Sequence, residues 1–164
     1  MTDSSSWKAF TVERTEHVAQ VTLIGPGKGN AMGPDFWSEL PQIFAQLDAD
    51  REVRAVVLTG SGKHFSYGLD LPAMAGDLGP VLADKAQAKP RTDFHAMVKR
   101  MQGAITRSPT AANPLSLRSR WCIGGGVDLI SASDIRYASA DAQFSVREVK
   151  VGMVATSVAS LAFP

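Results

Sequence analysis

Apolar and polar residues alternate along two short segments near the start of the chain, residues 10–14 and 17–23. Because successive side chains of a strand point to opposite faces, this alternation predicts two half-buried strands, and Thr15-Glu16 between them predicts a hairpin. A glycine-rich loop follows at residues 25–30. Apolar residues then recur at helical spacing, which predicts a helix with Asp35 in its capping region and a buried face made of Phe36, Leu40, Ile43, Phe44 and Leu47.

Residues 54–60 form a nearly continuous apolar run that ends in glycine, and they predict a strand buried on both faces. The order strand, helix, strand indicates a right-handed crossover and an α/β fold. Residues 62–71 then predict a glycine-punctuated loop at the end of that strand, where α/β proteins commonly bind ligands. Weaker patterns predict a mobile loop over 75–92, a helix over 94–105, a helix start at 127–130 and a strand over 134–138.

The composition is that of an ordinary globular protein, with 164 residues, 45% of them hydrophobic and 20% charged, and a formal net charge of +1. This length predicts a single domain over residues 1–164, and the near-neutral charge argues against a nucleic-acid partner. The three histidines and the single cysteine, Cys122, form no ligand cluster, so we expect no metal site and no disulfide. Residues 1–6 do not resemble a signal peptide and no apolar run has membrane-spanning length, so we expect no membrane partner and a cytoplasmic location.

Three consecutive glycines at 124–126, followed by Asp128 and later by Glu148, carry the clearest chemical signal. Glycines at a helix N-terminus leave N–H groups that can stabilise an anion, and two carboxylates can exchange protons with a substrate. Simpler interpretations stay open, because the glycines could form a plain tight turn and Asp128 could interact with the helix dipole. Glu148 could likewise be a surface charge paired with Arg147 or Lys150. The spacing of a dinucleotide loop or a P-loop is absent from this segment.

Four segments carry a resemblance to the crotonase (enoyl-CoA hydratase/isomerase) superfamily and keep the order of that family: residues 30–32, 56–60, 63–71 and 121–153. The resemblance implies an α/β fold of the ClpP/crotonase type, which is a spiral of β-β-α units. It also implies an acyl-CoA thioester as the ligand and a homotrimer or hexamer as the usual assembly. No separate cofactor is expected, because coenzyme A is part of the substrate.

The same resemblance implies roles for individual residues. The backbone N–H groups of Ser66 and Gly125 would form an oxyanion hole for the thioester oxygen. Asp128 and Glu148 would be the catalytic acid/base pair. Further substrate contacts would fall on Asn30, Ala31, Phe65, Tyr67, Gly68, Asp70, Leu71 and Gly124. Hydratases of this family carry glutamates at both acid/base positions. The aspartate at position 128 makes this chain more similar to the dienoyl-CoA isomerases of fatty-acid β-oxidation, which shift a 3,5-diene to a 2,4-diene.

Several departures from the family pattern bear on activity. Thr156 stands where the family has a third aspartate, and residues 109–120 contain two prolines and two arginines where the family has a buried central strand. Compensating frameshifts around 109–120 and 156–159 would explain both, a hypothesis that resequencing of the gene tests. The family also continues beyond residue 164 into C-terminal helices that build the trimer interface, so we expect an incomplete domain, weak or absent activity, and aggregation or an unstable monomer in place of a homotrimer. Two alternatives to the isomerase are therefore an enoyl-CoA hydratase and a degenerate fragment that at most binds acyl-CoA.

Overall fold

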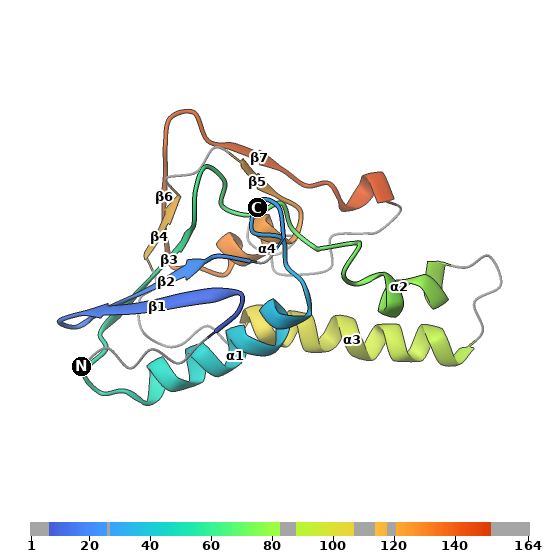
Figure 1. Ribbon diagram of the computed structural model, residues 1–164, viewed down its shortest axis with the longest axis horizontal. Coiled ribbons are helices and arrows are strands. Elements are labelled where there is room, and N and C mark those ends of the chain that lie inside the picture. Colours follow the sequence, from blue (N-terminus) through green and yellow to red (C-terminus); the bar gives the residue numbers. More distant parts are fainter. Residues whose placement is uncertain (1–6, 26, 83–87, 107–113, 118–120, 152–164) are drawn as a thin grey trace.

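The computed structural model describes residues 7–25, 27–82, 88–106, 114–117 and 121–151 (Figure 1). The chain begins with a hairpin in which β1 (Phe10–Thr15) runs antiparallel to β2 (Val18–Leu23). Helix α1 (Pro34–Ala49) then carries the chain back, so that β3 (Ala55–Gly60) pairs in parallel with β2. The predicted hairpin, helix and parallel crossover are therefore confirmed, because the strand and helix periodicities of these segments are unbroken.

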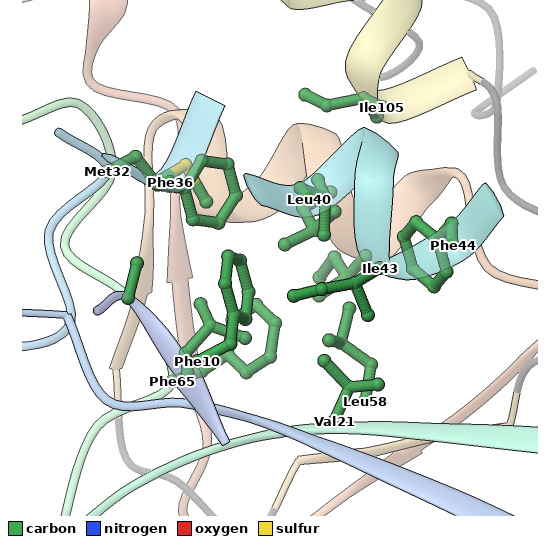
Figure 2. Close-up of a cluster of buried hydrophobic side chains, with 14 of the residues drawn as sticks. Phe10, Val21, Met32, Phe36, Leu40, Ile43, Phe44, Leu58, Phe65 and Ile105 are labelled. Atoms are coloured by element: carbon green, nitrogen blue, oxygen red, sulfur yellow. The ribbon is translucent and has the colours of Figure 1, made fainter. Parts of the chain in front are cut away.

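The apolar core lies between this sheet and the inward face of α1 (Figure 2). Leu40 and Ile43 of the helix face Val21 and Leu58 of the strands, and all four side chains are buried. Such burial of aliphatic side chains stabilises a fold by about 1.5–3 kcal/mol for each side chain. The predicted apolar face of α1 is thus the face that holds the helix on the sheet.

Strand β3 differs from its prediction in one respect. Val56 and Leu58 are buried, but Val57 and Thr59 on the opposite face are only half-buried. The expectation of burial on both faces is therefore wrong for this strand. The continuous apolar run could not reveal this, because the covering of the second face depends on other parts of the chain.

Two further strands extend the sheet in parallel, so that its order is β1-β2-β3-β4-β6. Strand β4 (Pro114–Leu117) lies between β3 and β6 (Ile135–Ala138). The prolines and arginines of residues 109–120 had predicted that this segment would not form a central strand. That expectation is wrong for Pro114–Leu117, because the proline is the first residue of the strand, where a missing N–H donor is tolerated. Residues 109–113 and 118–120 lie outside the described residues, as does Thr156, and the frameshift hypothesis stays a prediction.

Two helices occupy most of the segment that was predicted to be a mobile loop. Helix α2 covers Ala75–Leu82, and α3 covers Ala88–Thr106, so the loop prediction over 75–92 is wrong for both helical parts. Met74 and Leu78 are buried and attach α2 to the rest of the protein. Helix α3 packs against both α1 and α2 (Figure 1). Tertiary packing therefore overrides the weak local pattern of this segment.

The last described part of the chain carries the glycine triplet. Strand β5 (Trp121–Ile123) leads into the predicted helix, α4 (Gly125–Ser131), and pairs in parallel with β7 (Gln143–Ser145) in a second, two-stranded sheet. A short 3-10 helix, η1 (Glu148–Val151), follows β7. The predicted strand at 134–138 is confirmed as β6. Among the described helices, none is both long and apolar enough to cross a bilayer.

Candidate active site

Each glycine of the triplet has a structural reason to lack a side chain, and Gly126 packs closely against the loop that carries Ser66. A Cβ atom placed on Gly126 would lie 3.2 Å from both Cβ and the carbonyl oxygen of Ser66. A Cβ on Gly125 would lie 3.2 Å from Sδ of Met32, and Gly124 has a left-handed φ of +54°. A side chain at Gly126 would press on the Ser66 loop, one at Gly125 would press on Met32, and one at Gly124 would be strained by its backbone conformation, so the triplet does more than make a turn.

Backbone hydrogen bonds hold the Ser66 loop alongside β5. The N–H of Phe65 donates to the carbonyl of Trp121 at 3.0 Å, and the N–H of Ile123 donates to the carbonyl of Ser66 at 2.9 Å. The loop is tied on its other side by the N–H of Tyr67, which donates to the Gly29 carbonyl at 2.9 Å. These bonds bring the two predicted oxyanion-hole residues, far apart in sequence, to neighbouring positions.

The N–H groups of Ser66 and Gly125 take no part in this hydrogen-bond network. Within the part of the chain that the structure describes, neither group donates a well-aligned hydrogen bond. For Gly125 this follows from its place as the first residue of α4, since the first N–H groups of a helix precede its internal hydrogen bonds. Ser66 is fully buried, so its N–H lies in the protein interior beside the glycine segment.

A cavity of about 590 Å³ opens beside this glycine segment. Five predicted site residues line it: Tyr67, Leu71, Gly124, Gly125 and Glu148. Its wall is mainly apolar, which suits an acyl chain, and its other lining residues are Leu69, Trp121, Ile123, Arg147 and Lys150.

Glu148 places a carboxylate on the wall of this cavity. Its Oε1 would lie 3.3 Å from a Cβ atom on Gly124, so the carboxylate sits directly over the glycine backbone. Its Oε2 is buried and has no hydrogen-bond partner among the described residues. Burial raises the pKa of Glu148, the charge of Asp128 adds to the increase, and backbone hydrogen bonds oppose it. Neither Arg147 nor Lys150 forms an ion pair with Glu148 in the described structure.

Asp128 lies in the first turn of α4 and is 8% exposed. It is close enough to raise the pKa of Glu148, and it is the second cause, after burial, that raises the pKa of the Cys122 thiol to about 12. Asp128 is not among the lining residues of the cavity described above. The structure therefore brings the two carboxylates into electrostatic contact but exposes only Glu148 to the cavity.

The other predicted substrate contacts lie around the cavity rather than in its wall. The side chains of Asn30 and Phe65 are buried, and Gly68 is buried with a left-handed φ of +81°. A Cβ on Gly68 would lie only 2.7 Å from the carbonyl oxygen of Ile123, so this glycine permits the approach of the loop to β5. Ala31 and Asp70 are half-buried, and Oδ1 of Asp70 accepts a hydrogen bond from the Ala73 N–H at 3.0 Å.

Sequence reasoning missed half of the cavity wall. Trp121 and Ile123 belong to β5, Arg147 and Lys150 lie close to Glu148 in sequence, and Leu69 lies between two predicted residues, so all five are sequence neighbours of predicted site residues. These residues could have been suggested by their closeness in sequence to the predicted site residues. The sequence does not show, however, which side of a loop faces a ligand. Across the described residues, no group of three or more His, Cys, Asp or Glu side chains is arranged to hold a metal ion.

Comparisons with known proteins add an independent line of argument. The family model described as Enoyl-CoA hydratase/isomerase matches residues 13–164. Over 141 residues the chain is 42% identical to a Rattus norvegicus protein named Delta(3,5)-Delta(2,4)-dienoyl-CoA isomerase, mitochondrial, an alignment that covers 85% of this chain and 43% of the relative. A peroxisomal protein of the same name from Arabidopsis thaliana is 37% identical over 131 residues, which cover 79% of this chain and 47% of that relative.

A solved structure is similar over almost the whole chain. It is described as a putative enoyl-CoA hydratase from Streptomyces coelicolor A3(2), with a TM-score of 0.73 and 28% identity. The similarity covers 98% of this chain and 56% of that chain. The chain thus spans about half the length of the proteins that it matches.

Proposed function

Because the chain belongs to the enoyl-CoA hydratase/isomerase family, we propose that it binds acyl-CoA thioesters and isomerises a 3,5-dienoyl-CoA to the 2,4-dienoyl-CoA. Its fold is the α/β fold of the crotonase type, as expected. The observation that carries the proposal is the Glu148 carboxylate, placed over the Gly124 backbone in the wall of an apolar cavity. The relatives named as dienoyl-CoA isomerases favour this reaction over hydration.

The first step of the proposed reaction is proton removal from carbon 2 by Glu148. Burial raises the pKa of this carboxyl, which makes the ionised group a stronger base than an exposed glutamate. As the C–H bond breaks, its electron pair spreads over the diene and the thioester oxygen becomes an enolate. The N–H groups of Ser66 and Gly125 would stabilise that oxygen, and a single donor of this kind contributes about 3–4 kcal/mol.

The second step returns a proton to the far end of the diene, at carbon 6. Asp128 would donate this proton, so that the trienolate is neutralised and the double bonds come to rest at carbons 2 and 4. One proton has then moved to Glu148 and one has left Asp128, and exchange with solvent resets both groups. The two carboxylates interact, since the charge of Asp128 contributes to the raised pKa of Glu148, and such a pair favours a state that holds one proton between its two members. The proposed reaction requires that this proton lie on Asp128 and that Glu148 be ionised when the substrate binds.

The proposal is tested with the purified chain and two substrates. We expect 3,5-octadienoyl-CoA to give the longer-wavelength absorbance of a 2,4-diene conjugated with the thioester carbonyl. Glu148→Gln should lower kcat by at least about 100-fold, as expected for loss of a general base. Crotonyl-CoA serves as the hydration substrate. Hydration without isomerisation would make the chain a hydratase, and no turnover of either substrate would overturn both enzymatic assignments.

A second candidate is acyl-CoA binding without turnover. The burial of Asp128 favours it, because a proton donor that does not line the cavity has no direct path to carbon 6. Calorimetric titration with octanoyl-CoA separates the two, since heat of binding in the absence of turnover supports only this candidate. No heat with either coenzyme A or octanoyl-CoA would exclude binding as well.

The location and assembly of the protein remain predictions. The relatives are named as mitochondrial and peroxisomal, and they therefore lend no support to the cytoplasmic location that we expected. Subcellular fractionation tests it. The homotrimer or hexamer expected from the family stays a prediction too, and sedimentation velocity would measure it directly.

A further inference from the structure

The direction of the Ser66 N–H is set by the carbonyl group in the same peptide plane. A peptide bond is planar and trans, so its N–H points opposite to its C=O. The Ser66 N–H shares its plane with the Phe65 carbonyl, and whatever holds that carbonyl also aims the N–H. Nδ2 of Asn30 donates to the Phe65 carbonyl oxygen at 3.0 Å, inside the protein.

Asn30 is itself held rigidly. Its Nδ2 also lies 3.0 Å from the carbonyl oxygen of Ser61 and 2.8 Å from that of His64, so its two hydrogens are shared among three carbonyls. Its Oδ1 accepts from the Ser61 hydroxyl at 2.9 Å. Its backbone has a left-handed φ of +52°, which asparagine tolerates better than most residues. The side chain is 6% exposed, and Asn30 does not line the cavity described above.

The Ser66 hydroxyl closes the same network from the other side. It donates to the Asn30 carbonyl at 2.9 Å and accepts from the Gly68 N–H at 3.0 Å. These bonds fix the turn from Ser66 to Gly68, and the Ile123 N–H fixes the Ser66 carbonyl. Both peptide planes that flank the Ser66 Cα atom are therefore held by hydrogen bonds.

We propose that Asn30 and the Ser66 hydroxyl are positioning groups that aim the Ser66 N–H at the developing oxyanion, rather than groups that bind substrate. This inference rests on the proposed function. An oxyanion donor interacts more strongly with the transition state than with the ground state, so misaiming it lowers kcat and leaves KM nearly unchanged. A residue that contacts substrate in both states would raise KM instead.

The test compares three variants with 3,5-octadienoyl-CoA as substrate. Ser66→Ala keeps the backbone N–H and removes only the hydroxyl, while Asn30→Gly keeps the left-handed backbone and the carbonyl but removes the amide. We expect each to lower kcat by about tenfold, the equivalent of one net hydrogen bond, with KM changed by less than about twofold. Ser131→Ala is the matched control, because its buried hydroxyl donates within α4 to the Val127 carbonyl at 2.8 Å and makes no hydrogen bond to the loop among the described residues.

The double variant Asn30→Gly/Ser66→Ala should lose less than the product of the two single effects, because both groups hold one donor. A raised KM with normal kcat in Asn30→Gly would overturn the inference and make Asn30 a substrate contact. A kcat in Ser66→Ala equal to that of Ser131→Ala would also overturn it.

A second readout keeps this inference separate from the proposed function. In the free protein, Ser66→Ala should speed amide hydrogen exchange at Gly68, whose N–H loses its acceptor, while Ser131→Ala should leave that rate unchanged. Faster exchange at Gly68 supports the positioning network whether or not the wild-type chain turns over either substrate. Absence of turnover would count only against the proposed function. Unchanged exchange at Gly68 would overturn the positioning role.

Discussion

The carboxylate of Glu148 illustrates how a single residue couples the site to stability. Its Oε2 is buried without a hydrogen-bond partner among the described residues, so the ionised form is poorly solvated. Burial accordingly raises its pKa in the folded protein, and the charge of Asp128 acts in the same direction. A carboxyl whose pKa is raised by folding favours the folded state when protonated, and this contribution is lost as pH rises through the folded-state pKa.

Glu148→Gln should therefore stabilise the protein at neutral pH relative to wild type, because glutamine has a similar shape and no charge to desolvate. The difference in Tm between variant and wild type should be smallest near pH 4, where an ordinary glutamate becomes protonated, and should grow toward about pH 7. Differential scanning calorimetry across this range measures it. Glu13→Gln on the exposed face of β1 controls for removal of a surface charge. A Tm difference that does not change with pH would contradict the prediction.

The same residues show what a sequence can and cannot reveal about a site. The motif residues Ser66, Gly125 and Glu148 do come together, and each could be identified in the sequence because it belongs to a segment with a distinctive local pattern. The depth of Asp128 below the cavity was not predictable, since it depends on how α4 packs against its neighbours. The role of Asn30 was equally hidden, because its partners are carbonyl groups more than thirty residues away in the chain.

At the scale of elements, a buried carboxylate joins the N-terminal strand to α1. Glu39 of α1 is 9% exposed and accepts hydrogen bonds from the N–H groups of Lys8 at 2.9 Å and Ala9 at 2.9 Å. These groups lie just before β1, so the contact orients the strand as it enters the sheet. Buried N–H groups that lose their acceptor cost free energy, since water cannot replace it.

Glu39→Ala is expected to lower the free energy of unfolding by about 1–3 kcal/mol, the cost of leaving the buried N–H of Ala9 without its acceptor. Glu13→Ala, which removes an exposed carboxylate from β1, should change it by less than about 0.5 kcal/mol. Urea denaturation followed by circular dichroism provides both values. Equal effects of the two substitutions would show that the Glu39 contact does not hold the strand.

Elements with a strong period were predictable, whereas those that depend on distant packing were not. The hairpin and α1 follow directly from alternation and helical spacing. Helix α2 contains Gly76, Gly79 and Pro80, a composition typical of loops, and it is anchored instead by Met74 and Leu78. Strand β4 likewise begins at a proline and is defined by its neighbours β3 and β6 rather than by its own residues.

For the whole molecule, ligand binding should appear as added stability. A ligand that binds only the folded state raises the free energy of unfolding, by about 2.7 kcal/mol at a concentration 100 times its Kd. The cavity wall is mainly apolar, so octanoyl-CoA should raise Tm more than coenzyme A alone. This measurement does not depend on turnover, and it therefore applies to the isomerase and to the binding candidate alike.

A matched pair of exposed residues tests whether the cavity is where the ligand binds. Leu71 lines the cavity and is 40% exposed, while Val18 on β2 is 41% exposed and lies outside the cavity wall. Leu71→Asp places a charge against the acyl chain and should abolish most of the Tm increase caused by octanoyl-CoA, whereas Val18→Asp should retain it. Both substitutions add one exposed carboxylate, so both can lower the Tm of the free protein. For each variant the Tm with octanoyl-CoA is therefore compared with the Tm of the same variant without ligand, which removes this effect. Equal shifts in the two variants would place the ligand elsewhere on the protein, and the Glu148 cavity would then lose its assignment as the acyl-CoA site.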